Sequence, residues 1–113
     1  MCNKATLNYI TSKVAQAASD SLGDKLEKVI LYGSYAREDY DEESDIDIMV
    51  LANIPHEDCW QKRKDIRKLL GMLDVEFDIL ISLRVTDCST FYRYLEDLPF
   101  YANVLRDGVE LSA

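Results

Sequence analysis

The sequence predicts one small α+β domain, in which helices pack mainly on one face of a small mixed β-sheet. Apolar residues recur at helical spacing in two segments, and three short apolar runs have the length and alternation of strands. With 113 residues the chain can bury one core but has no room for a second substrate domain. We therefore expect residues 1–113 to form a single domain.

The first elements are a helix over Ala5–Ser21 and a strand over Lys25–Tyr32. Apolar side chains repeat every three or four residues through the helix, which gives it one face to cover a sheet, and Gly23 ends it. The strand runs directly into Gly33 and Ser34. A glycine and a serine at the end of a strand place a tight polar turn at the edge of the sheet.

An acidic segment and a second strand come next. Acidic residues crowd Glu38–Ser44, so this segment is expected to be an exposed turn. The following strand begins at Ile46 and ends near Leu51. Because side chains alternate along a strand, Asp45 and Asp47 are expected to point to the same face.

A second helix is expected from Trp60 to about Leu73, with its lysines and arginines on the solvent side. A third strand is predicted over Val75–Leu83, where Glu76 and Asp78 would share one face. Two short helical pieces separated by Pro99 would complete the fold, before a last apolar stretch at residues 109–111.

The charge and the cysteines limit the class of protein. A formal net charge of −8 repels a phosphate backbone, so no direct nucleic-acid partner is expected, although a mononucleotide can bind through divalent metal. Three cysteines, Cys2, Cys59 and Cys88, lie far apart, and we expect reduced thiols without a zinc site. No secretory signal or membrane-spanning run is visible, so we expect a cytoplasmic protein without a membrane partner.

The polar residues at the strand ends predict phosphoryl chemistry. Gly33 lets the backbone approach a ligand closely, and Ser34 with the amides of its turn can donate hydrogen bonds to phosphate. Carboxylates two residues apart on a strand, Asp45 and Asp47, can share two metal ions, and Asp78 is expected to supply a third ligand. Because like charges repel one another unless a cation lies between them, the set favours two Mg²⁺ ions, with Mn²⁺ as an alternative.

The segment Gly33-Ser34-Tyr35-Ala36-Arg37, followed by Ser44-Asp45-Ile46-Asp47, resembles the signature of the polymerase-beta-like nucleotidyltransferases. Within that superfamily, the short chain and its C-terminal sequence resemble the minimal nucleotidyltransferases of HEPN/MNT toxin–antitoxin pairs. The resemblance implies the polymerase-beta-like nucleotidyltransferase fold. It also implies an antitoxin that transfers AMP from ATP to a tyrosine of a HEPN ribonuclease toxin.

The resemblance also implies roles for single residues. Gly33 and Ser34 would hold the triphosphate, and Arg37 would contact phosphate or brace the turn. Asp45 and Asp47 would bind both metals, while Asp78 would bind the catalytic metal and help to deprotonate the acceptor. The family commonly has glycine where this chain has Glu38, which leaves the path of the turn open.

Several alternatives stay open at this stage. Glu76 could replace Asp78 as the third ligand. The chain could neutralise a toxin by binding alone, or it could modify a small molecule together with a second subunit that holds the acceptor. A calcium loop starting at Asp39 is excluded, because Ser44 stands where glycine must turn and Val50 where a glutamate must close the site.

Overall fold

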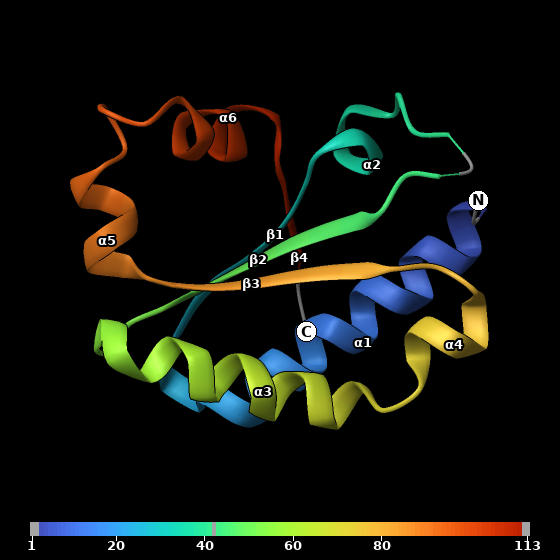
Figure 1. Cartoon of the computed structure of the whole chain (residues 1–113), viewed down its shortest axis with the longest axis horizontal. Coiled ribbons are helices and arrows are strands. Elements are labelled where there is room, and N and C mark those ends of the chain that lie inside the picture. The colour runs from blue at the N-terminus through green and yellow to red at the C-terminus, as the bar shows by residue number, and fades with distance from the viewer. Residues whose placement is uncertain (1–2, 42, 112–113) are drawn as a thin grey trace.

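The computed structural model describes residues 3–41 and 43–111, so Cys2 and Glu42 lie outside the described residues. In chain order the elements are α1 (Lys4–Leu22), η1 (Gly23–Lys25), β1 (Leu26–Tyr32), α2 (Ser34–Arg37), β2 (Ile46–Ala52), η2 (His56–Asp58), α3 (Cys59–Leu70), α4 (Leu73–Phe77), β3 (Ile81–Asp87), α5 (Cys88–Arg93), α6 (Pro99–Asp107) and β4 (Val109–Leu111). These elements confirm the α+β class (Figure 1).

The sheet is mixed, as predicted, with the strand order β3-β2-β1-β4. β1 runs antiparallel to β2 and β4, whereas β2 and β3 are parallel. The register places Asp47 of β2 between Tyr32 of β1 and Ser82 of β3. Three neighbouring strands therefore bring these side chains to one end of the same face of the sheet.

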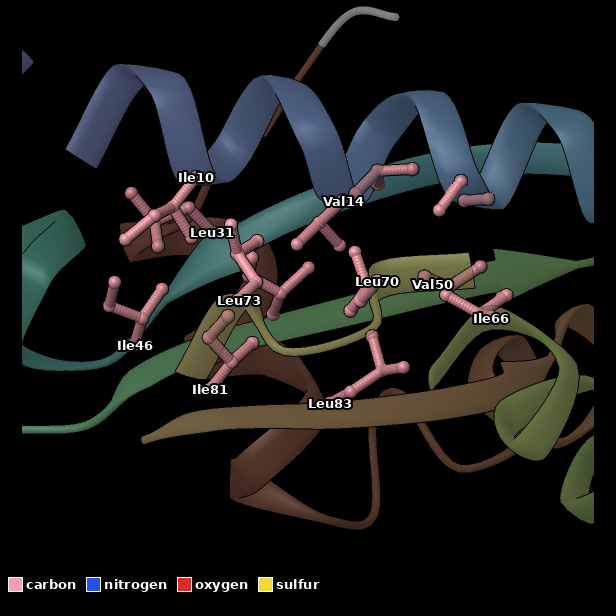
Figure 2. Close-up of a cluster of buried hydrophobic side chains, with 14 of the residues drawn as sticks. Ile10, Val14, Leu31, Ile46, Val50, Ile66, Leu70, Leu73, Ile81 and Leu83 are labelled. Atoms are coloured by element: carbon pink, nitrogen blue, oxygen red, sulfur yellow. The ribbon is translucent and has the colours of Figure 1, made fainter. Parts of the chain in front are cut away.

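The main core lies between the sheet and the two long helices, α1 and α3, which lie on one face (Figures 1 and 2). The side chain of Asn3 accepts a hydrogen bond of 2.8 Å from the Thr6 amide at the start of α1, and Gly23 follows its last turn. This helix is the one predicted from the apolar spacing. Its side chains Ile10 and Val14 pack with residues of α3 and of all three long strands (Figure 2).

A smaller core lies on the opposite face, where α5 and α6 cover part of the sheet (Figure 1). Phe91 of α5 and Val104 of α6 are buried against Ile30, Met49 and Leu51. The prediction of two short helical pieces is confirmed, and Pro99 is the first residue of the second one.

The strand predicted over Val75–Leu83 is wrong in its first half. Residues 73–77 form the helix α4, and β3 begins only at Ile81. Leu73 and Phe77, one helical turn apart, both pack on the main core, so this apolar run has helical rather than strand spacing. Asp78 therefore lies in the αL conformation after α4, with φ = 50°, and shares no strand face with Glu76.

The basic side of α3 is not simply solvated, contrary to the expectation. Arg63 donates to the carbonyl of Leu83 at 2.9 Å, and Arg67 donates to the carbonyl of Ile81 at 3.3 Å. Because β3 is an edge strand, these hydrogen bonds satisfy backbone groups that no strand pairs on that side. The arginines thus attach α3 to the edge of the sheet.

We expect Asp74→Ala to lower the free energy of unfolding by about 1–3 kcal/mol. One carboxylate oxygen of Asp74 accepts from the Ile81 amide at 2.8 Å, and the other accepts from Arg67 at 3.1 Å. Alanine would leave a buried amide unpaired. Urea unfolding would measure the loss beside Asp65→Ala, whose carboxylate bonds only an exposed glutamine, Gln61; equal effects would contradict this role.

Candidate active site

Gly33 stands where β1 ends and lies directly against Asp47. Its backbone has φ = 74° and ψ = −156°, a conformation that side chains disfavour. A Cβ atom at this position would overlap the Asp47 Oδ2 atom and lie 3.2 Å from its Cγ. The absence of a side chain is therefore what allows the turn and the carboxylate to be adjacent.

The turn after Gly33 is closed by backbone hydrogen bonds. Ser34 is the first residue of the single-turn helix α2, and its carbonyl accepts from the Asp39 amide at 3.1 Å. Glu38 has φ = 64°, so it occupies the left-handed conformation that glycine adopts most easily. The path of this turn, which the sequence left open, is therefore sharp, and glutamate adopts the left-handed conformation in it.

Asp47 is a half-buried carboxylate with a second carboxylate close by. Burial, followed by the negative charge of Asp45, raises the pKa of Asp47 above its usual value. A hydrogen bond from Ser82 and the positive charge of Arg37 act in the opposite direction. Asp45 and Asp47 therefore repel each other across an incompletely neutralised site.

These two carboxylates fit a divalent cation. Both are oxygen donors at the end of one strand, and the repulsion that raises the pKa of Asp47 disappears when a cation lies between them. The turn that begins at Gly33 lies directly beside the Asp47 carboxylate. The amides of such a turn can donate hydrogen bonds to phosphate, so the two parts could together receive a metal-bound phosphate group.

Arg37 ends α2 and lines a hollow of about 220 Å³ next to this turn. The other lining residues come from the end of β1 and from α6, namely Tyr32, Gly33, Phe100, Asn103, Val104 and Asp107. The Nε atom of Arg37 lies 3.1 Å from Asp39 Oδ2 in an exposed ion pair. Since such a pair contributes little stability, Arg37 can exchange this partner for a phosphate at small cost.

Asp78 is the predicted site residue that the structure supports least. It is exposed, it follows α4, and it precedes the first residue of β3 by three positions. It lines a separate hollow with Asp74, Val75, Ile79 and Leu80. Its part as a third carboxylate stays a prediction.

Three further residues of the site were missed by the sequence analysis. Ser82 lies across from Asp47, and Arg84, two residues along β3, hydrogen-bonds the Tyr32 hydroxyl. Burial, then the charge of Asp47, raises the pKa of Tyr32, so its hydroxyl is neutral near pH 7. The alternation of polar residues at positions 82, 84 and 86 could have revealed this face of β3.

Arg84 brings a positive charge to the open side of the site. Its guanidinium lies 4.8 Å from the centre of the Phe100 ring, and Phe100 meets Tyr32 edge to face at 5.7 Å. A cation held on an aromatic ring keeps a fixed position while its charge stays available. Arg84 can therefore attract the anionic tail of a nucleotide toward the carboxylates.

Comparison with known proteins identifies the family of this chain. The family model described as "Nucleotidyltransferase domain" matches residues 12–106. The protein MJ0141 of Methanocaldococcus jannaschii, named as a candidate protein adenylyltransferase, is 45% identical over 82% of this chain and 86% of its own length. A second protein of that organism, MJ0604, carries the same kind of name and is 32% identical over 74% of this chain and 76% of its own length.

Solved structures show the same fold. A minimal nucleotidyltransferase has a TM-score of 0.63 at 20% identity, with 97% of both chains covered. A toxin–antitoxin complex crystallised with AMP-PNP has a TM-score of 0.54 at 21% identity, covering 91% of this chain and 73% of the other. The chain belongs to the nucleotidyltransferase domain family, and it is a nucleotidyltransferase.

Proposed function

We propose that this chain is a Mg²⁺-dependent protein adenylyltransferase that transfers AMP from ATP to a tyrosine of a HEPN-type ribonuclease toxin. The observation that carries the proposal is the contact between the Gly33 turn and the Asp47 carboxylate. In the proposal, the turn would bind phosphate and the carboxylate would bind metal, on the two sides of one reacting phosphate. The names of the M. jannaschii relatives support a protein acceptor.

Different residues of the chain would bind the triphosphate and the metal. Ser34 and its turn would hold the triphosphate, and Arg37 and Arg84 would neutralise its outer oxygens. Asp45 and Asp47, with Asp78 as the proposed third ligand, would hold Mg²⁺. When bound, Mg²⁺ supplies positive charge at the phosphate that is attacked and at the leaving diphosphate.

We propose that residues 1–113 act as one cytoplasmic domain and that another molecule supplies the acceptor. On α5, on α6 and in the turn between them, exposed aromatic and aliphatic side chains offer a contact surface: Tyr92, Tyr94, Leu98, Phe100 and Leu105. This surface adjoins the hollow lined by Arg37, since Phe100 belongs to both. A partner bound there would lie beside the triphosphate.

A toxin as acceptor is consistent with the charge of the chain. The net charge of −8 disfavours direct contact with RNA, the substrate of such a toxin. Adding a phosphodiester next to the toxin's active site would repel RNA by the same rule. The similarity in fold to a toxin–antitoxin complex supports this choice of partner.

Of the residues that the structure describes, none forms a helix able to cross a membrane.

The test is the intact mass of a purified HEPN toxin incubated with the chain, ATP and Mg²⁺. We expect a gain of one or more AMP units, lost with Asp45→Asn/Asp47→Asn and with EDTA. A tyrosine-to-phenylalanine change at the modified position of the toxin should also abolish the gain. If the toxin is inhibited equally by the wild type and the double variant without any mass gain, the chain acts by binding alone and the proposal fails.

A further inference from the structure

A second cluster of ligand-type side chains lies at the other end of the sheet from Asp47. His56 belongs to η2, Cys59 is the first residue of α3, and Asp87 ends β3. Their ligand atoms all lie within 4.8 Å of one another. The sequence led us to expect reduced thiols without a zinc site, but His56, three residues before Cys59, turns toward the same point.

The position of the cluster separates it from the nucleotide site. Asp87 pairs with Ala52, whereas Asp47 pairs with Ser82, five residues back along both strands. At about 3.3 Å per residue, the two sites are about 16 Å apart. In Figure 1 the cluster belongs to the left end, where β3 runs into α5 and α3 begins.

The distances within the cluster approach those of a tetrahedral zinc site. His56 Nδ1 lies 2.9 Å from Asp87 Oδ1, and Cys59 Sγ lies 3.9 Å from the same oxygen. Ordinary zinc bonds at tetrahedral angles place nitrogen and oxygen ligands about 3.4 Å apart, and sulfur and oxygen about 3.6 Å apart. Movements of about half an ångström or less would bring these two pairs to those values.

The cluster is built rather than accidental. Asp87 is only 2% exposed, and its second oxygen accepts from the Thr90 amide at 2.9 Å, which fixes the carboxylate at the start of α5. Cys59 is also buried, while the His56 side chain is 78% exposed. Asp87 and Cys59 are therefore held in the interior, whereas His56 lies at the surface, where its side chain can move to bind an incoming ion.

A path to the cluster exists. His56 and Cys59 line a hollow of about 410 Å³ together with Trp60, Arg63 and residues 82–85 of β3. An ion that enters from this hollow would meet three protein ligands and keep water as the fourth, as in open zinc sites. A thiolate and an imidazole favour a cation of the Zn²⁺ type over Mg²⁺, because Mg²⁺ prefers oxygen ligands.

A reactive cysteine is the main alternative for these residues. Burial, followed by the negative charge of Asp87, raises the pKa of Cys59, so the thiol is protonated at neutral pH and is a poor nucleophile. The surroundings thus do not activate Cys59 by themselves. A divalent cation would replace the thiol proton and compensate the two negative ligands.

We propose that His56, Cys59 and Asp87 bind one thiophilic divalent cation of the Zn²⁺ type, with water as the fourth ligand. His56 binds through Nδ1 after the proton that Nδ1 donates to Asp87 has moved to Nε2, Asp87 binds as the carboxylate, and Cys59 binds as the thiolate. The thiol proton passes to the solvent, so one proton is released for each ion bound. The ion joins η2, α3 and the junction of β3 with α5.

The experiment is a titration of the full chain carrying Asp45→Asn/Asp47→Asn with Co²⁺, a spectroscopic substitute for Zn²⁺. Removing both carboxylates leaves the nucleotide site unable to compete for the ion. We expect one equivalent of Co²⁺ to give a thiolate-to-metal charge-transfer band and tetrahedral ligand-field bands, and Zn²⁺ to displace it. Cys59→Ser should abolish the charge-transfer band, and His56→Ala should weaken binding at least about tenfold.

Cys88→Ser is the matched control, because Cys88 adjoins Asp87 in sequence and its thiol is the nearest competitor. It should leave the spectrum unchanged. His56 is exposed, so its alanine variant is expected to fold, and circular dichroism would confirm this. A spectrum that lacks the charge-transfer band, or one that is lost with Cys88→Ser and kept with Cys59→Ser, would overturn the proposal.

Discussion

Asp47→Asn is expected to lower the rate of AMP transfer by at least about 10²–10³-fold and to leave the fold intact. The carboxylate lies between Tyr32 and Ser82 and against Gly33, where an amide of the same shape keeps the packing but cannot neutralise a cation. Single-turnover transfer with ATP and Mg²⁺ would measure the loss. Glu96→Gln makes the same chemical change at an exposed position and should keep the wild-type rate.

The same substitution should raise the melting temperature when divalent cations are removed by EDTA. The pKa of Asp47 is higher in the folded protein than in the unfolded chain, because burial and Asp45 disfavour its charge. Such a group favours folding below its unfolded pKa of about 4, and that contribution is lost as the pH rises through the folded pKa. At pH 7 the ionised Asp47 therefore opposes folding. Asparagine removes this unfavourable contribution because it carries no charge.

Two controls distinguish this effect from a general change in stability. The difference in melting temperature between Asp47→Asn and the wild type should shrink as the pH falls toward 4, where Asp47 takes up a proton. Adding Mg²⁺ should stabilise the wild type and leave the variant unchanged. A variant that melts lower than the wild type in EDTA at pH 7 would contradict the electrostatic repulsion between Asp45 and Asp47.

The sequence was sufficient to predict those elements whose signals are local. The helix α1 follows from apolar residues on one face, and β2 follows from the alternation that begins at Ile46. In both elements, the neighbouring cap or turn residues indicate the same boundaries as the spacing of the apolar residues. The turn at Gly33 and the pair Asp45 and Asp47 could be assigned for the same reason, since each lies directly beside such a strand.

The elements that the sequence did not predict depend on contacts between residues that are distant in the chain. α4 replaces the first half of a predicted strand because Leu73 and Phe77 pack on α1 and the sheet, and because Asp74 binds Ile81 and Arg67. These partners are separated in sequence, so no local pattern shows them.

Tyr32 and Arg84 could not be assigned to the site for a related reason. Their position follows from the parallel register of β2 and β3, which places Arg84 two residues beyond the partner of Asp47. Strand register is fixed by packing over the whole sheet. The cluster of His56, Cys59 and Asp87 is hidden in the same way, because Asp87 joins it only after β3 is placed.

Gly33→Ala is expected to abolish transfer and to lower the free energy of unfolding by more than the strain of its backbone alone. The added methyl would overlap Asp47 Oδ2, so either the turn or the carboxylate must move. A displacement of about 1 Å at a reacting centre can cost about 10²-fold in rate. Backbone strain for alanine in this conformation, which is nearly restricted to glycine, adds about 1–3 kcal/mol.

Gly71→Ala separates these two effects, because Gly71 has nearly the same backbone conformation. Its φ and ψ are 60° and −125°, but an added Cβ would have no atom within 4 Å. Gly71→Ala should therefore be destabilised by the backbone strain alone, which corresponds to a fall of about 4–13 °C in melting temperature, and it should keep the wild-type rate of transfer. If both variants lose activity equally, the rate depends on global stability, and the contact between Gly33 and Asp47 has no special role in catalysis.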